Sequence, residues 1–240
     1  MAKTFLQLLN EVGKNLRRST GSTYTTITQS ADVVLTGQLI NEAKRMVEAR
    51  WKWSALRATV NFTSVGGTAT YALTDAMIAS TVTRERAELI MDPDNRPMFW
   101  DVTTSPGFRM SLCTQDYAVD AQNVYVQTLA TPGVAAVYDN GAGLSVKFPQ
   151  APGGVRNYRL VVKNPQDDLD NASTTLLVPW RPVVLAATAI AFDERGEDLG
   201  GDSNRWWERY EDALSEAMGR DSTAADFVLR ADTIDGYWKN

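Results

Sequence analysis

The residue types that most enzymes use for proton transfer or metal binding are scarce in this chain. Its 240 residues include no histidine and one cysteine, Cys113. Ser/His/Asp triads, Cys/His dyads and His-ligated zinc or iron all need an imidazole, so the sequence excludes these sites. Cys113 lies in a strand-like run without a histidine to activate it, and we expect it to be a small core residue. We therefore predict a protein that is not an enzyme, with no cofactor and no metal.

Carboxylates leave a narrower chemistry open. The acidic cluster at residues 167–171 lacks the glycine and distal glutamate of a calcium loop, so a solvated turn is the favoured interpretation. Glu85, Glu88 and Asp101 could support glycoside hydrolysis, which needs two carboxylates and no histidine. Residues 141–143, Gly-Ala-Gly, resemble part of a phosphate loop, but a strand pattern follows them instead of a helix. A carbohydrate-binding or glycan-cleaving β module stays open as an alternative.

Charge is distributed unevenly along the chain. The net charge is -5, and it divides into +5 over residues 1–57, -3 over residues 58–192 and -7 over residues 193–240. Basic helices at the start could pair with acidic helices at the end, within a subunit or between neighbouring subunits. The alternative is two solvated faces with little coupling, since exposed ion pairs are worth about 0 to 1 kcal/mol. The acidic balance argues against sequence-specific DNA binding.

Composition indicates a folded protein of cytoplasmic origin. Hydrophobic residues make up 44% and charged residues 22%, which are ordinary globular proportions. No apolar run is long enough to cross a bilayer, and the first ten residues become polar too soon for a signal peptide. We expect no membrane partner.

The start of the chain has helical periodicity. The run from Lys3 to Arg18 carries one apolar stripe, and a Ser/Thr-rich loop follows it. A longer stripe begins after Asp32, which we expect to be the N-cap, and closes on Trp51 and Trp53. These patterns predict two helices before residue 56.

The period changes to two between about Arg57 and Lys163. Two alternating runs flank Gly66-Gly67, which is the signature of a β-hairpin. Several short strands with turns between them suggest a small antiparallel sandwich or barrel. The other strands are expected at residues 82–91, 108–112, 124–128, 144–148 and 158–162.

Helical patterns return near the end. The step at Pro179 predicts a helix whose alanine-rich part, residues 183–192, would let another helix approach closely. A last helix is expected to begin at Asp202 or Ser203 and to end at Gly219. The residues from about 220 onward look like an arm, because their apolar side chains form no long stripe.

The fold class that follows is α+β. Both chain ends would form a helical bundle frame, residues 1–56 and 172–240, around an inserted antiparallel β-sandwich or barrel-like domain at residues 57–171. Trp206 and Trp207 point about 100° apart on a helix, so one core cannot easily take both, and Trp207 is expected to face a neighbouring subunit.

Three segments resemble the head-to-tail adaptor (connector) proteins of tailed phages. They are the helix from Phe5 to Gly13, the helix from Leu39 to Trp53 that runs straight into the expected hairpin, and the late helices around Trp180-Arg-Pro and Trp206-Trp-Glu-Arg-Tyr210. The resemblance covers the helical frame, about half of the chain, and is nearest to the tail tubular protein A type of short-tailed phages.

The resemblance implies a structural virion protein that forms a homo-oligomeric ring, expected to be a 12-mer, between the portal protein and the tail. Double-stranded DNA would pass through the ring without specific contacts, and tail nozzle, stopper or tail fibre proteins would bind below it. A tail-completion or stopper ring protein is a second alternative. The expected contact residues are Arg50, Trp207 and Arg209 between subunits and Phe227, Leu229, Tyr237 and Trp238 on the portal.

Overall fold

The computed structural model describes residues 2–16, 23–73, 87–92, 94–124, 132–141, 143–195 and 202–237, with side chains in the last helix as far as Ser222. The chain divides into two compact units, which are described separately below. The helical unit comprises Met1–Ala55 with Asp168–Asn240, and the β unit comprises Leu56–Asp167. The fold class predicted from sequence, α+β, is confirmed. The predicted domains, residues 1–56 with 172–240 and residues 57–171, stay a prediction.

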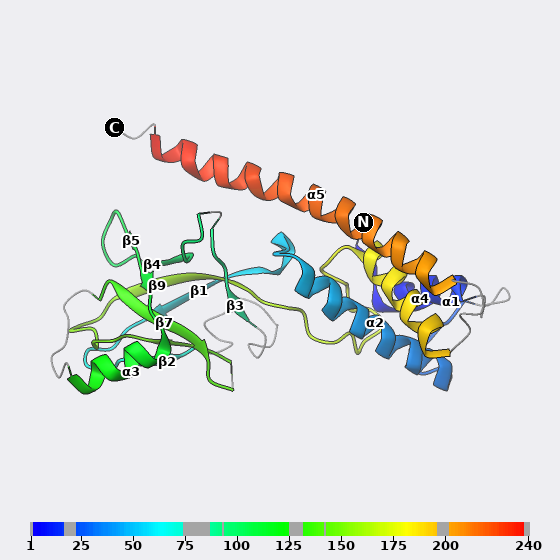
Figure 1. Ribbon diagram of the computed structural model, residues 1–240, viewed down its shortest axis with the longest axis horizontal. Coiled ribbons are helices and arrows are strands. Elements are labelled where there is room, and N and C mark those ends of the chain that lie inside the picture. Colours follow the sequence, from blue (N-terminus) through cyan, green and yellow to red (C-terminus); the bar gives the residue numbers. More distant parts are fainter. Residues whose placement is uncertain are drawn as a thin grey trace. The chain divides into compact units, whose positions relative to one another are not determined.

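Four helices make up the helical unit (Figure 1): α1 (Phe5–Asn15), α2 (Ala31–Arg50), α4 (Trp180–Arg195) and α5 (Asp202–Tyr237). Thr4 caps α1 in a capping box with Gln7, which satisfies two backbone donors that the helix leaves free. Ser30 caps α2, and its hydroxyl accepts a hydrogen bond from the Val33 N–H. The predicted N-cap, Asp32, is therefore wrong by two residues and lies in the first turn.

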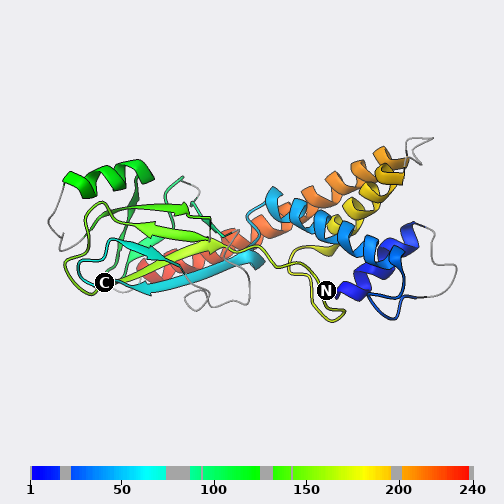
Figure 2. The ribbon, with the colours of Figure 1, turned by 90° about the horizontal axis from the view of Figure 1, so that it is seen from below.

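The alanine-rich face of α4 lies at the centre of this unit. The helix α4 lies beside α2 and α5 (Figure 2) and also contacts α1. Its residues Ala186, Ala187 and Ala189 are fully buried. Small side chains let the neighbouring helix backbones approach. On α2, Gly37 serves the same purpose, because a Cβ at that position would lie 3.0 Å from the Phe5 ring of α1.

The last helix is longer than expected. The helix α5 runs through Gly219 and continues to Tyr237, 36 residues in all, so the end predicted at Gly219 is wrong. A glycine inside a helix costs only about 1 kcal/mol relative to alanine, and contacts elsewhere can outweigh that cost. The predicted arm is helical in its backbone as far as Tyr237.

Two sheets form the β unit, and neither closes into a barrel among the described residues. The first sheet has the order β1-β9-β4-β5, with β3 also paired to β9. The second has the order β2-β8-β7-β6, in which β6 and β7 are parallel. The first sheet consists of β1 (Arg57–Thr63), β3 (Glu88–Leu89), β4 (Phe99–Asp101), β5 (Phe108–Arg109) and β9 (Asn157–Lys163), and the second of β2 (Thr70–Ala72), β6 (Ser111–Leu112), β7 (Val134–Asp139) and β8 (Leu144–Lys147).

The hairpin predicted at Gly66-Gly67 is wrong. A turn is present, with Gly67 at φ 81°, but β1 pairs with β9 and β2 pairs with β8, so the chain crosses from one sheet to the other. Both strands direct alternate side chains into one core, and the long-range partners that share this core determine the pairing.

Two other predicted strands differ from the structure in part. Of the strand predicted at residues 124–128, only Val124 is described, and it is the last residue of a helix, α3 (Gln115–Val124). Of the strand predicted at residues 82–91, Glu88–Leu89 forms β3, and residues 82–86 lie outside the described residues.

An aromatic cluster fills the space between the two sheets. Phe62 stacks on Tyr158 at 5.1 Å between ring centroids, and Phe148 lies 5.0 Å from the same ring. Phe62 and Tyr158 are paired in register on β1 and β9, whereas Phe148 directly follows β8 of the second sheet. Both sheets therefore contribute to one core, which also includes Val60, Leu73, Phe99, Met110, Val146 and Leu160.

Two tyrosines at this core differ in how their hydroxyls are satisfied. The Tyr158 hydroxyl is buried and has no hydrogen-bond partner among the described residues, and burial raises the pKa of this phenol. The Tyr71 hydroxyl, in contrast, accepts from the Val65 N–H at 3.0 Å and donates to the Thr68 carbonyl at 2.7 Å.

We expect Tyr158→Phe to leave the free energy of unfolding unchanged or to raise it by up to about 1 kcal/mol, because the change removes a buried hydroxyl without a partner. The matched variant Tyr71→Phe should lower it by about 1 kcal/mol, since it removes the hydrogen bonds between the hydroxyl and the turn at residues 65–68. Chemical denaturation followed by tyrosine and tryptophan fluorescence measures both. A clear loss of stability in Tyr158→Phe would contradict this description of the core.

Candidate functional site

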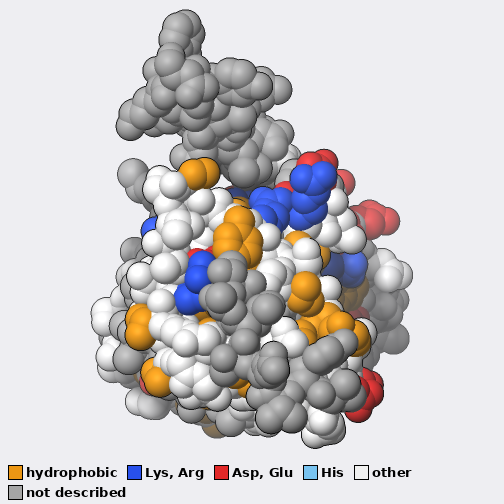
Figure 3. Space-filling model, turned by 90° about the vertical axis from the view of Figure 1, so that its left-hand side faces the viewer, with side chains coloured by type: hydrophobic (Ala, Val, Ile, Leu, Met, Phe, Trp, Pro, Cys, Tyr) orange, Lys and Arg blue, Asp and Glu red, His pale blue; other side chains and the backbone are white. Residues whose placement is uncertain are grey.

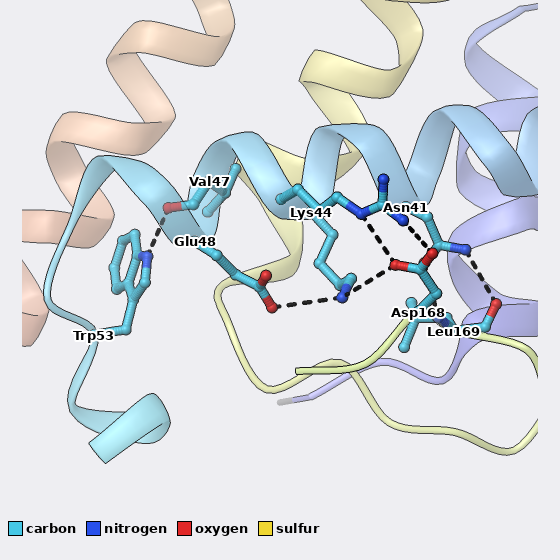
Figure 4. A network of polar contacts seen from close by, with 8 residues as sticks. Asn41, Lys44, Val47, Glu48, Trp53, Asp168 and Leu169 are labelled. Carbon is cyan, nitrogen blue, oxygen red and sulfur yellow. Dashed lines mark hydrogen bonds and ion pairs between the residues drawn. The ribbon is translucent and has the colours of Figure 1, made fainter. Parts of the chain in front are cut away.

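The most buried charges of the helical unit lie on α2 (Figure 4). Lys44 and Glu48 are 0% and 1% exposed, and the Lys44 Nζ lies 3.6 Å from the Glu48 Oε1 and 3.8 Å from the Asp168 Oδ1. Arg45 holds the same Asp168 carboxylate with its Nε at 3.2 Å and with a second, shorter contact from its Nη2. A buried charge is tolerated when opposite charges surround it in this way.

Asn41 extends this network to the backbone of the returning chain. Its Nδ2 donates to the Leu169 carbonyl at 3.2 Å, and its Oδ1 accepts from the Leu169 N–H at 2.8 Å. The side-chain amide thus pairs with both backbone groups of one residue (Figure 4). Together with the ion pairs of Asp168, these bonds fix the point where the chain re-enters the helical unit.

Within the acidic cluster at residues 167–171, Asp168 therefore anchors the returning chain to α2. The interpretation of this cluster as a solvated turn holds only in part, because Asp168 joins two cations of α2 while Asp170 is exposed. Within the described ranges, no group of three or more His, Cys, Asp or Glu side chains is arranged to hold a metal ion.

A second carboxylate holds α5 against the end of α2. The Asp221 Oδ2 accepts hydrogen bonds from the Trp51 indole N–H at 3.0 Å and from the Ser54 backbone N–H at 3.1 Å. The Ser54 hydroxyl donates to the Asp221 Oδ1. The Val47 carbonyl, in the last turn of α2, accepts a hydrogen bond from the Trp53 indole N–H at 2.7 Å. This bond fixes the buried Trp53 ring near the end of α2.

The residues expected between subunits lie on α2 and α5. Arg50 is exposed and approaches Glu211 of α5 at 3.7 Å, so one basic–acidic pair joins the two helices within the subunit. Trp207 is half-buried, and its indole N–H donates to Asp193 at 2.9 Å. The guanidinium of Arg209, also exposed, lies 5.0 Å from the ring of Trp206. Trp207 and Arg209 lie two residues apart on α5, so their side chains point to different sides of the helix, and their role between subunits stays a prediction.

The residues expected to bind the portal lie in the last part of the chain. Phe227, Leu229 and Tyr237 belong to the backbone of α5, whose side chains are described only as far as Ser222, and Trp238 lies outside the described residues. Their portal contacts stay a prediction.

The candidate carboxylates of the β unit have structural partners. Asp101 is fully buried on β4, where its Oδ2 accepts from the Arg156 Nε. Glu88 on β3 approaches Lys163 of β9 at 3.8 Å, whereas Glu85 lies outside the described residues. Cys113 is half-buried, and burial raises the pKa of its thiol, which disfavours the reactive thiolate.

Gly141 and Gly143 of the Gly-Ala-Gly segment lie between strands β7 and β8. Gly141 and Gly143 have φ values of 82° and 119°, conformations that glycine adopts at no steric cost. Strand β8 follows at Leu144, so the helix N-terminus that a phosphate loop needs is not at this position.

Each unit has a hollow on its surface. On the helical unit, a groove of about 540 Å³ is lined by Leu177, Trp180 and the stretch of α5 from Ala213 to Asp221. On the β unit, a pocket of about 340 Å³ is lined by Tyr117 and Val134 among others.

On the face that Figure 3 shows, the coloured hydrophobic and basic side chains form separate groups and no continuous basic surface. None of the helices, as far as they are described, is long and apolar enough to span a membrane.

We expect Lys44→Ala to lower the free energy of unfolding by about 3 to 5 kcal/mol, because it leaves the buried Glu48 carboxylate without the cation beside it. The control is Asp170→Ala, a change of an exposed acid, which should stay within about 0.5 kcal/mol of the unchanged protein. Urea denaturation monitored by far-UV circular dichroism provides both values. Equal stability of the two variants would show that the contacts of Lys44 with Glu48 and Asp168 do not stabilise the helical unit.

Comparison with known proteins adds one finding. No curated protein matches the chain. The family model of the SU10 adaptor protein matches residues 3–230 and so covers both units and most of α5. The narrower likeness to tail tubular protein A stays a prediction, whereas the broader prediction of a phage adaptor is confirmed. The chain belongs to the SU10 adaptor protein family, a family of structural phage adaptors.

Proposed function

We propose that this phage adaptor forms a ring between the portal and the tail, and that the C-terminal part of α5 binds the portal protein. As a member of the family, the chain is a structural component of the virion and interacts with other virion proteins. The proposal adds the ring, its expected twelve subunits, the passage of double-stranded DNA through its lumen, and assembly in the host cytoplasm. The tail nozzle, stopper or tail fibre proteins would bind its other side.

The observation that carries the proposal is the length of α5. It has 36 residues and α4, its main contact within the helical unit, has 16. At about 1.5 Å per residue these helices are about 54 Å and 24 Å long, so α4 can cover less than half of α5. A helix that extends far past its packing partner is well suited to insert into a groove on another protein.

Ring formation requires two different surfaces on each subunit that fit together head to tail. Arg50 on α2 and Arg209 on α5 are exposed, and Trp207 on α5 is half-buried. Such arginines and aromatic side chains are enriched in protein interfaces. The helical bundle frame would supply these contacts, while the β unit would be free to bind tail components.

The charge of the chain supports DNA passage without binding. The 24 Lys and Arg of the chain are outnumbered by 29 Asp and Glu, so the net charge is -5 and repels phosphates overall. Since phosphate contacts by Lys and Arg supply most non-specific affinity for DNA, an acidic duct would not retain the DNA that moves through it.

We further propose that the protein has no catalytic activity. The chain has no histidine, and Glu88 and Asp101 are engaged with Lys163 and Arg156. This pairing weakens the alternative of a glycan-cleaving β module, which needs two carboxylates facing a substrate. The stopper or tail-completion ring differs from the adaptor in its partner, so binding to purified portal rings separates the two.

Removal of residues 224–240 should abolish binding to portal rings and leave the protein folded, because the groove-binding part of α5 is lost while Asp221 and the packed part remain. Co-sedimentation with purified portal, together with circular dichroism and gel filtration of the truncated protein, measures this. The control is the double variant Arg181→Ala/Glu216→Ala, which removes an exposed ion pair on α4 and α5 and should bind normally. Unimpaired binding by the truncated chain would disprove the role of the segment.

The charge reversal Arg209→Glu should prevent complete rings from forming on the portal, because it places an acid at the proposed contact between subunits. Arg181→Glu, a reversal of similar exposure on α4, serves as the control and should form complete rings. Electron microscopy of portal–adaptor complexes counts the bound subunits. Complete rings of Arg209→Glu would place the subunit contact elsewhere.

A further inference from the structure

The packing of α5 on the helical unit ends before the helix does. Tyr210, Ala213 and Leu214 are 1%, 5% and 3% exposed, and Leu214 is the last buried side chain of α5 among those described. Gly219 follows, and a glycine inside a helix weakens it. The two turns after Leu214 therefore need another source of stability.

We propose that Asp221 is a positioning residue that fixes where, and in which direction, α5 extends past the helices it packs on, so that its C-terminal part meets its partner as a preformed helix. This inference rests on the proposed function of that part of α5. It names a residue outside the segment expected to bind the portal, two turns beyond the last buried side chain.

The contacts of Asp221 come from one short segment. Trp51 follows the last residue of α2, and Ser54 is the first residue of the 3-10 helix η1 (Ser54–Leu56). The carboxylate accepts from the Trp51 indole at 3.0 Å, from the Ser54 N–H at 3.1 Å and from the Ser54 hydroxyl. Both of its oxygens are used, so the side chain is held at two points and cannot turn freely.

The bond to the Ser54 N–H has a specific physical reason. The first N–H groups of a helix have no partner within that helix, and an acidic side chain is a strong acceptor for them. Here α5 supplies this acceptor to η1 from a distant part of the sequence. Loss of the Asp221 carboxylate would leave the start of η1 and the Trp51 indole without this partner, and would detach α5 at the same point.

Two other contacts near Asp221 are weaker. Arg50 and Glu211 are 3.7 Å apart, with both side chains 57% exposed, and Arg181 and Glu216 are 3.3 Å apart, with side chains 63% and 47% exposed. Exposed pairs of this kind contribute little. The Asp221 contacts involve one backbone donor and one half-buried indole, so we expect them to restrain this part of α5 more than the two exposed ion pairs do.

A restraint of this kind would favour partner binding. A segment that is already ordered in its bound direction loses less conformational entropy when it binds, so its affinity is higher than that of a free arm. The sequence-based expectation of an arm and the observed helix differ in this respect, and Asp221 explains why the helix continues past Gly219.

The test compares Asp221→Ala with Asp212→Ala, an exposed acid on the same helix. Two quantities are measured on the full chain: amide hydrogen exchange of residues 215–222, and the Kd for purified portal rings. We expect Asp221→Ala to speed exchange and to weaken portal binding, each by roughly tenfold, as loss of a charge-assisted hydrogen bond would produce. Asp212→Ala should change neither, and Ser54→Ala should change both in the same direction as Asp221→Ala, but less.

The outcomes separate this inference from the proposed function. If exchange in Asp221→Ala equals that of the unchanged protein, Asp221 does not restrain α5 and the inference fails, whatever the portal affinity. If exchange becomes faster but the portal Kd stays the same, Asp221 only stabilises the helix and does not position it. If the unchanged protein does not bind portal rings, the proposed function fails, and the exchange data alone decide whether Asp221 restrains the helix.

Discussion

The first two helices pack on each other, and α4, which comes from a late part of the chain, completes the burial of their apolar stripes. This constraint determines the organisation of the helical unit: α4 contacts both early helices and α5, and its buried alanines permit the close approach. The polar contacts of α2 follow from it. Lys44, Arg45 and Asn41 hold the returning chain at Asp168 and Leu169, and Asp221 of α5 holds the segment that leaves α2. The helix α2 thus anchors the returning chain, and Trp51 and Ser54, which directly follow α2, anchor α5.

Much of this arrangement could be predicted from the order of the periodic patterns. Helical periods at both ends and a period of two between them lead to the α+β class, because each pattern reports which face of an element is buried. Strand pairing could not be predicted in the same way. The turn at Gly66-Gly67 is typical of a hairpin, yet Phe62 pairs with Tyr158 and Tyr71 with Val146, because the aromatic core needs strands from both sheets and no local pattern encodes that requirement.

The contact surfaces were predictable to a different degree. The helical positions of Arg50, Trp207 and Arg209 could be predicted, and all three residues lie on helices. The α4 partners of the tryptophans, Asp193 for Trp207 and Phe192 for Trp206, could not be predicted, because helical spacing gives the direction of a side chain and not its neighbour. Asp221 was missed altogether. Gly219 has a low helix propensity and is therefore typical of a helix end, yet α5 continues through it. The hydrogen bonds that Asp221 makes with Trp51 and Ser54 join residues far apart in the sequence, and local sequence patterns do not predict such bonds.

The early strand-like contact between the two chain ends has a consequence for biosynthesis. Thr4 forms a bridge with Thr175, the Phe5 N–H donates to the Thr174 carbonyl, and the Leu176 N–H donates to the Lys3 carbonyl. These bonds cannot form until the ribosome has made residue 176 of 240, whereas the β unit, Leu56–Asp167, is one uninterrupted stretch that is complete before that point. The apolar faces that α1 and α2 turn toward α4 stay uncovered until α4 has been made, and exposed apolar surface of this kind favours aggregation during synthesis.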